Sequence, residues 1–176
     1  GSAYMYFGGL WGGQLERWQT GSYMPNAEGP GFNENALGPR AAKMKDSMLE
    51  FDGDVKEIII LDENGKPLKA YNNTKRFFEG VWVHRYKDTY YMSYSTGDTH
   101  LLVYATSKNP LGPFTYRGII LEPVKGWTTH HSIVEFKGTW YLFHHDAALS
   151  GADNKRSVQL KELHYNDDGT IQTITP

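Results

Sequence analysis

Polar and apolar residues alternate over residues 81–86, and an aromatic run follows at 89–95. A period of two is typical of a β-strand with one buried face. A polar turn at 87–88 separates the two runs and has the length of a tight hairpin connection. The pattern therefore predicts a β-hairpin over residues 77–95, with the carboxylate of Glu79 at its open end.

Short strands separated by turns account for the rest of the chain, and no stretch shows the period of a helix. A loop rich in Gly, Pro and Asn at 21–39 interrupts the strands, and loops of this length are usually functional or disordered. Besides the hairpin, we predict strands at 4–7, 14–20, 40–45, 56–61, 101–107, 114–121, 130–136, 139–145, 156–165 and 170–175, and a Gly-rich corner at 10–13. The chain is therefore expected to be all-β.

The hairpin pattern recurs after ~50 residues, which lies in the range of β-propeller blades. Val81-Trp82-Val83 aligns with Ser132-Ile133-Val134, and the strands that follow then align as well. We therefore expect a β-propeller fragment of roughly three four-stranded antiparallel blades, the first lacking its inner strand. The blade-like units span residues 3–76, 77–123 and 124–176.

Composition adds a high aromatic share, 14% of 176 residues. Aromatic rings suit sheet packing and, in a carbohydrate-binding protein, stacking on sugars. The net charge is −2 with both signs mixed, so we expect no nucleic-acid partner. No apolar run reaches the ~18 residues of a membrane span, so no membrane contact is expected. Cysteine is absent, which excludes disulfides but does not decide the compartment. Gly1-Ser2 is expected to be an expression scar, so a native signal peptide could have been removed and localisation stays undetermined.

Glu79 is the candidate general acid. Phe77, Phe78 and Trp82 place apolar surface around its carboxyl group. Such surroundings raise a carboxyl pKa because they disfavour the charged form. A glutamate that stays protonated near neutral pH can donate a proton to a leaving group. The alternative, which composition alone favours, is an ordinary glutamate at the start of a strand.

Several motifs together resemble glycoside hydrolase family 43. The match covers nearly all of the chain beyond Phe77, and the first strand with Gly8-Gly9 resembles a middle blade of the same fold. The motifs are Phe78-Glu79-Gly80, Tyr90-Tyr91-Met92-Ser93-Tyr94-Ser95, Tyr104-Ala105-Thr106-Ser107, Pro110-Leu111-Gly112-Pro113-Phe114, His130-His131-Ser132, Lys137-Gly138-Thr139-Trp140, Arg156-Ser157-Val158 and Asn166-Asp167-Asp168-Gly169.

Members of this family are five-bladed propellers, among them β-xylosidases, α-L-arabinofuranosidases and arabinanases, and they invert configuration with three carboxylates. The resemblance implies that Glu79 is the acid, although Val81 stands where many members have proline. The family's Asp base and pKa-tuning Asp precede a strand like residues 4–7, so the chain is expected to be catalytically incomplete alone. Inversion requires two carboxyl groups ~6.5–9.5 Å apart. Asp98 and Asp146 are the substitutes considered for the base.

The resemblance matches His130 to a histidine near the propeller axis that contacts the sugar or a hydrated calcium ion. His131 leaves this match open by one position, and only one of the two can face the axis because side chains alternate along a strand. Calcium prefers oxygen ligands, so a structural calcium at His130 would be held mostly through water, and no cofactor is required. Zinc is an alternative with His144 and His145, but no spacing is specific for it.

Arg156 matches a family arginine near the acid, which binds the sugar and holds carboxylates in place. Its guanidinium can donate two hydrogen bonds to a carboxylate or to neighbouring hydroxyls. The alternative is a solvated arginine at a strand edge. Trp11 is either a wall of the sugar subsite or a core residue. The substrate-binding candidates are thus Arg156, His130 and Trp11.

The sequence thus predicts a partial β-propeller glycosidase domain over residues 1–176. By resemblance, it acts by inversion on plant polysaccharides or oligosaccharides that contain xylose or arabinose, and the preference between the two sugars stays open. The alternatives are a non-catalytic carbohydrate-binding remnant and a half-propeller that needs a complementary chain. An open propeller leaves strand edges and apolar faces uncovered, and such surfaces drive association. We therefore expect self-association or a partner chain with the missing blades.

Overall fold

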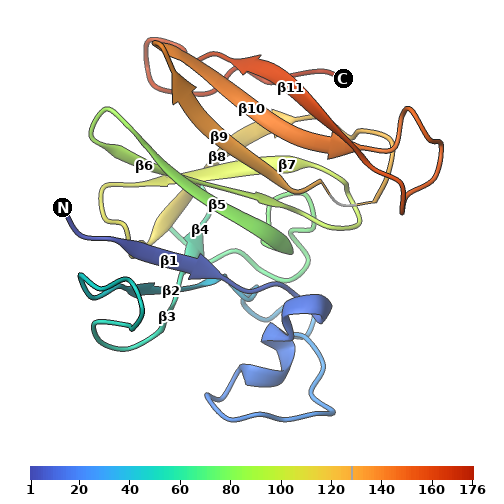
Figure 1. The fold of residues 1–176 in the computed structure, drawn as a ribbon. Coiled ribbons are helices and arrows are strands. Elements are labelled where there is room, and N and C mark those ends of the chain that lie inside the picture. Colours follow the sequence, from blue (N-terminus) through green and yellow to red (C-terminus); the bar gives the residue numbers. More distant parts are fainter. Residues whose placement is uncertain (128) are drawn as a thin grey trace.

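The computed structural model describes residues 1–127 and 129–176, and in these residues the regular elements are strands and two short 3-10 helices. The prediction of an all-β chain is confirmed. Figure 1 shows three sheets arranged one above the other. They are β1-β2-β3 (Tyr4–Phe7, Arg40–Lys43, Lys56–Glu57), β4-β8-β7-β6-β5 (Ile60–Leu61, Phe114–Leu121, Leu102–Ser107, Thr89–Ser95, Glu79–Tyr86) and β11-β10-β9 (Ser157–Leu163, Thr139–Asp146, His131–Phe136).

The predicted hairpin is present as β5 and β6 in the second sheet. The two strands pair from Trp82 opposite Ser93 to Tyr86 opposite Thr89. The register shifts between Glu79 and Trp82, where Gly80 has φ +70°. A bulge of this kind bends a strand and changes the direction of its side chains. It therefore decides where the carboxylate at the start of β5 points.

The third sheet packs on the second through aromatic rings. Tyr165 stacks on Tyr86 with ring centroids 3.7 Å apart, and its hydroxyl lies 2.6 Å from Nε2 of His84. The indole nitrogen of Trp82 donates a hydrogen bond of 3.1 Å to the carbonyl of Ile133 in β9. These contacts fix the start of β9 beside the start of β5.

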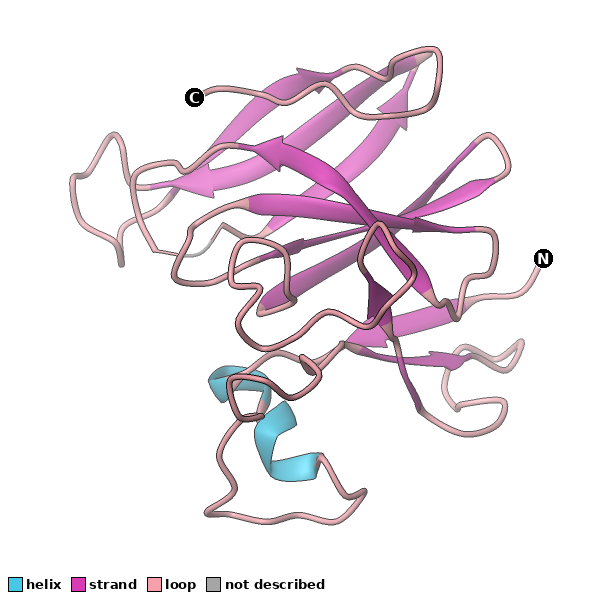
Figure 2. Cartoon of the chain, turned by 180° about the vertical axis from the view of Figure 1, so that it is seen from behind, coloured by secondary structure: helices cyan, strands magenta, loops and turns pink. Residues whose placement is uncertain are grey.

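Residues 14–20 do not form the predicted strand. They lie in and after two 3-10 helices, η1 (Trp11–Gly13) and η2 (Leu15–Trp18), which Figure 2 shows in cyan. Gln14 between them has a left-handed backbone with φ 58°, and the amide of Leu15 donates to the carbonyl of Gly9. The chain folds back on itself here because Leu15 is buried against the core, which strand alternation alone does not reveal.

The predicted strand at 56–61 is also divided. Its first part, β3, belongs to the first sheet, whereas β4 pairs in parallel with β8 of the second sheet. The amide of Ile58 donates to the carbonyl of Pro39, and the carbonyl of Ile59 accepts from Phe114. The segment therefore changes sheets at these two residues, so β4 widens the second sheet to five strands.

Residues 170–175 do not form a regular fourth strand in the third sheet. Ile171 makes a single bridge to Tyr165, and Ile174 makes one to Leu121 of the second sheet. The amide of Ile171 donates to the hydroxyl of Tyr104, 2.9 Å away, instead of extending a ladder along β11. The end of the chain thus ties the third sheet to the second, and the third sheet has three strands.

Two phenylalanines anchor the start of β5. Phe77 and Phe78 are both buried. The backbone of Phe78 receives a hydrogen bond from Leu10 and donates one to Ser95. Gly97 lies against the Phe78 ring, so that a Cβ atom there would approach the ring to 2.7 Å. Because Gly97 has no side chain, the Phe78 ring can pack against it. This packing helps to fix the position of Glu79, the residue after Phe78.

His84 and His131 lie where the second and third sheets meet, and both side chains are half-buried. Burial lowers the pKa of His84 to about 3. Burial also lowers the pKa of His131 to about 3, with smaller contributions from His84 and two other histidines. Both rings are therefore neutral in the folded protein near pH 7. Among the described residues, no helix has the length and apolar character needed to span a membrane.

We predict that Gly97→Ala lowers the free energy of unfolding by about 1–3 kcal/mol more than Gly138→Ala does. Both glycines have φ near +83°, so both substitutions strain the backbone, but only Gly97 has a ring in the way. Around Gly138 there is open space. Urea denaturation of the two variants measures the difference. Equal losses would show that Phe78 moves aside at no cost.

We also predict that the free energy of unfolding falls as the pH drops from about 6.5 towards 3. In this window the unfolded chain protonates His84 and His131, whereas the folded protein keeps them neutral. The unfolded state therefore binds more protons, and acid favours it. Urea denaturation at several pH values measures this slope. His164→Asn is the control, because the His164 side chain is exposed, and it should leave the slope unchanged.

Candidate active site

Glu79 begins β5, and its side chain is 23% exposed. Two glycines shape its surroundings. A Cβ atom on Gly9 would come within 3.0 Å of the Glu79 Cβ atom, so the loop after β1 approaches the base of the Glu79 side chain closely only because Gly9 has no side chain. Gly80 likewise leaves room for the ring of His130. The carboxylate thus lies between a loop of the first sheet and the start of the third.

His130 lies next to this carboxylate. Its Nε2 atom is 3.3 Å from Oε1 of Glu79, and its side chain is 55% exposed. The neighbouring His131 points elsewhere, because its Nε2 atom lies 2.5 Å from the hydroxyl of Ser93 between the sheets. Of the two histidines that the sequence left open, His130 is therefore the one whose ring contacts Glu79.

Arg156 reaches this part of the structure through His145. The ring of His145 stacks on that of His130, and its Nε2 atom accepts the backbone N–H of His130 at 3.1 Å. The same nitrogen lies 3.4 Å from Nη1 of Arg156, whose Nε donates to the carbonyl of Asp153. Burial, and next the positive charge of Arg156, lower the pKa of His145. A neutral His145 with Nε2 as acceptor can therefore hold both neighbours in place.

Trp11 lies against Phe78, the residue that precedes Glu79. The two rings meet edge to face with centroids 5.3 Å apart, and Trp11 is 66% exposed. Its backbone is left-handed, with φ 58°, and its N–H donates to Oε2 of Glu16 at 3.0 Å. Glu16 is buried, so a carboxylate inside the loop holds Trp11 in this strained conformation. Trp11 is thus a surface residue beside the site and not a core residue.

Sequence reasoning missed the roles of Glu16 and His145. Glu16 falls in a stretch whose pattern predicted a strand, so nothing marked it as a buried acid. His145 was considered only as a zinc ligand together with His144. The two side chains lie on opposite faces of β10, since residues alternate along it. Among the described residues, no three His, Cys, Asp or Glu side chains gather to hold a metal, which gives zinc no support.

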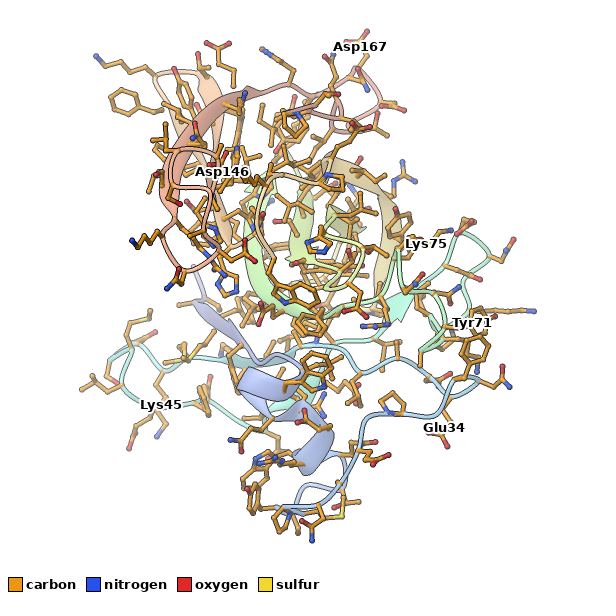
Figure 3. The ribbon with its side chains drawn as sticks, turned by 90° about the vertical axis from the view of Figure 1, so that its right-hand side faces the viewer. Glu34, Lys45, Tyr71, Lys75, Asp146 and Asp167 are labelled. Carbon is orange, nitrogen blue, oxygen red and sulfur yellow. The ribbon has the colours of Figure 1, made fainter. Side chains whose placement is uncertain are left out.

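The two acidic residues considered as a base lie apart in the fold. Asp146 ends β10, and its carboxylate accepts the N–H of Ala148 in the following turn. Figure 3 labels Asp146 on the side of the molecule away from Tyr71 and Lys75. Asp98 instead lines a hollow of about 340 Å³ together with Trp11 and Phe78. The carboxylate of Asp146 thus stabilises a turn. Asp98 lines the hollow together with the aromatic residues Trp11 and Phe78.

Curated relatives match the whole of this chain but only part of their own length. The xylosidase/arabinosidase 43A of Humicola insolens is 59% identical over 184 residues, which cover 100% of this chain and 56% of that protein. A xylosidase/arabinosidase of Bacteroides ovatus is 55% identical over 175 residues, which cover 99% of this chain and 54% of that protein. The chain therefore spans about half the length of the curated relatives it matches.

Solved structures show the same relation. A GH43 β-xylosidase/α-arabinofuranosidase from a compost microbial metagenome, in complex with xylotriose and in a calcium-free form, superposes with a TM-score of 0.96 at 56% identity, covering 99% of this chain and 55% of that chain. A GH43_1 enzyme from Xanthomonas citri complexed with xylotriose gives a TM-score of 0.97 at 50% identity, covering 100% of this chain and 54% of that chain. The three sheets are thus part of a β-propeller. Residues 22–171 match the model of glycosyl hydrolases family 43, and the chain therefore belongs to this family.

Proposed function

We propose that this chain is the acid-bearing half of an inverting glycoside hydrolase that acts on oligosaccharides or polysaccharides containing xylose or arabinose. The observation that carries the proposal is the contact of 3.3 Å between Glu79 and His130, beside a hollow with aromatic walls. The Glu79 side chain is 23% exposed, and this supports a role in which it meets a substrate from solvent. The names of the relatives supply the sugar class.

In the proposed reaction, the protonated carboxyl group of Glu79 gives its proton to the glycosidic oxygen as the bond to the anomeric carbon breaks. A water molecule attacks the opposite face of the sugar, and a second carboxylate takes its proton. We assign that base to the part of the propeller that lies outside this chain. His130 positions the Glu79 carboxyl, whereas Arg156 and Trp11 bind the sugar.

The groups around His130 do not fit a calcium cage made by the protein. Calcium is held by six to eight oxygen atoms, and here the neighbours of the ring are the Glu79 carboxylate and the ring of His145. A structural calcium at this point would therefore take most of its ligands from water. The proton transfer assigned to Glu79 uses no cofactor.

An uncovered apolar face supports a second candidate function, assembly with a complementary chain. Phe143 of β10 lies opposite Leu160, and His145 lies opposite Val158, so these side chains share one face of the third sheet. Val158 is 76% exposed, and Leu160 and Phe136 are also exposed. The opposite face is buried against the second sheet. We propose that the rest of the propeller covers this face, either in a longer polypeptide or as a partner chain.

Proton donation by Glu79 is tested in the chain reassembled with the complementary part of a close relative. Glu79→Gln should lower hydrolysis of xylosides with poor leaving groups by about 10²–10⁴-fold and spare substrates with good leaving groups, since acid help matters most for a basic departing oxygen. Glu135→Gln, at an exposed glutamate of β9, is the control. The isolated chain should show little or no turnover. Equal losses on both substrate types would argue against an acid.

Association through the apolar face is tested by sedimentation velocity. The chain alone should form a concentration-dependent oligomer, because exposed apolar side chains and the free edge of β1 favour contacts between copies. Val158→Lys combined with Leu160→Lys should shift it to the monomer, whereas Leu49→Lys, at another exposed leucine, should not. A wild-type chain that stays monomeric at every concentration would contradict the proposal.

A further inference from the structure

A hollow beside Glu79 has no role in the acid chemistry. It measures about 340 Å³ and opens between the loop around Trp11, the long loop at residues 29–37 and the segment before β5. Phe78, the residue next to Glu79, forms part of its wall. Pockets of this size that combine rings with a few polar groups are typical of small-molecule sites. The hollow is therefore next to the candidate acid in the structure.

Exposed rings continue from the hollow to the outside of the molecule. Phe32, which lines the hollow, is 73% exposed and packs against Tyr71 with ring centroids 5.2 Å apart. Tyr71 is exposed as well, and Figure 3 shows it on an outer side of the structure, near Glu34. Rings that the fold leaves in water provide flat apolar surface for the C–H faces of sugars. Together with Trp11 they form a track that leads away from Glu79.

The hollow also contains unused polar groups. Nε of Arg76 donates to the carbonyl of Ala70 at 3.0 Å, but its Nη1 atom is buried and has no hydrogen-bond partner among the described residues. Burial lowers the pKa of the Arg76 guanidinium, while the carboxylate of Asp98 opposes this shift. A buried donor without an acceptor favours a ligand that supplies one. Sugar hydroxyls can accept from Arg76 and donate to the exposed carboxylate of Asp98.

We propose that this hollow, with the Phe32–Tyr71 pair, binds the pentose units on the leaving-group side of the scissile bond. The side follows from the proposed role of Glu79, because an acid that protonates the departing oxygen must lie next to the sugar that departs. The inference rests on that proposed function. By this inference, the preference for substrate chain length depends on residues within this chain, namely Trp11, Phe32, Tyr71, Arg76 and Asp98.

The experiment separates binding from hydrolysis. Calorimetry measures the affinity of the isolated chain for xylose, xylobiose and xylotetraose, and kinetics of the reassembled protein compare xylotetraose with an aryl xyloside. Phe32→Ala combined with Tyr71→Ala, and separately Asp98→Asn, should each weaken xylotetraose binding by about tenfold, a typical value for one lost aromatic or charged contact. The loss of kcat/KM should be smaller for the aryl xyloside than for xylotetraose, because a single aryl ring occupies less of the hollow than a chain of pentose units.

Tyr23→Ala is the matched control, since Tyr23 is another exposed ring, which packs on Trp18 outside the hollow. Thermal unfolding checks that every variant folds. Unchanged affinity for xylotetraose in the Phe32 and Asp98 variants would overturn the inference, and so would equal losses on both substrates. Failure of the reassembled wild type on aryl xylosides would instead overturn the proposed hydrolase function, because the calorimetric result does not depend on turnover.

Discussion

The packing of the third sheet on the second determines where the candidate site forms. Tyr86, Tyr165 and His84 meet at the centre of this contact, and Trp82 bonds across it to the backbone of β9. Glu79 and His130 lie at the starts of strands in different sheets, so they are neighbours only because the sheets dock in this register. The half-buried histidines make the contact sensitive to acid, since a charged ring there would lose its hydration.

A second constraint comes from the first sheet. Its loop reaches the carboxylate through Gly9 and places Trp11 on Phe78 by means of a buried acid, Glu16. The site is thus assembled from three sheets, and each contributes a different property. The second supplies the candidate acid Glu79, the third supplies His130 with Arg156 behind it, and the first supplies aromatic surface. The candidate site therefore depends on all three sheets.

The family and the spanned length together limit the function. Relatives at 55–59% identity are xylosidase/arabinosidase proteins, and this chain covers little more than half of each. The third sheet has an exposed apolar face, and β1 lies at an edge of the first sheet. The function proposed above assigns both the base and the cover of this face to the part of the protein outside this chain.

The sequence by itself determined the all-β class, the hairpin at 77–95, the family and the identity of Glu79 as the candidate acid, because alternation, turn residues and local motifs are properties of short stretches. It also determined that only one of His130 and His131 can face the site. The tertiary structure decided which one, and it turned residues 14–20 into 3-10 helices, divided 56–61 between two sheets and drew 170–175 towards Tyr104. It alone brought His145 to Arg156 and Glu16 to Trp11. These outcomes depend on burial and on hydrogen bonds that form only in the folded chain, which the alternation of polar and apolar residues does not encode.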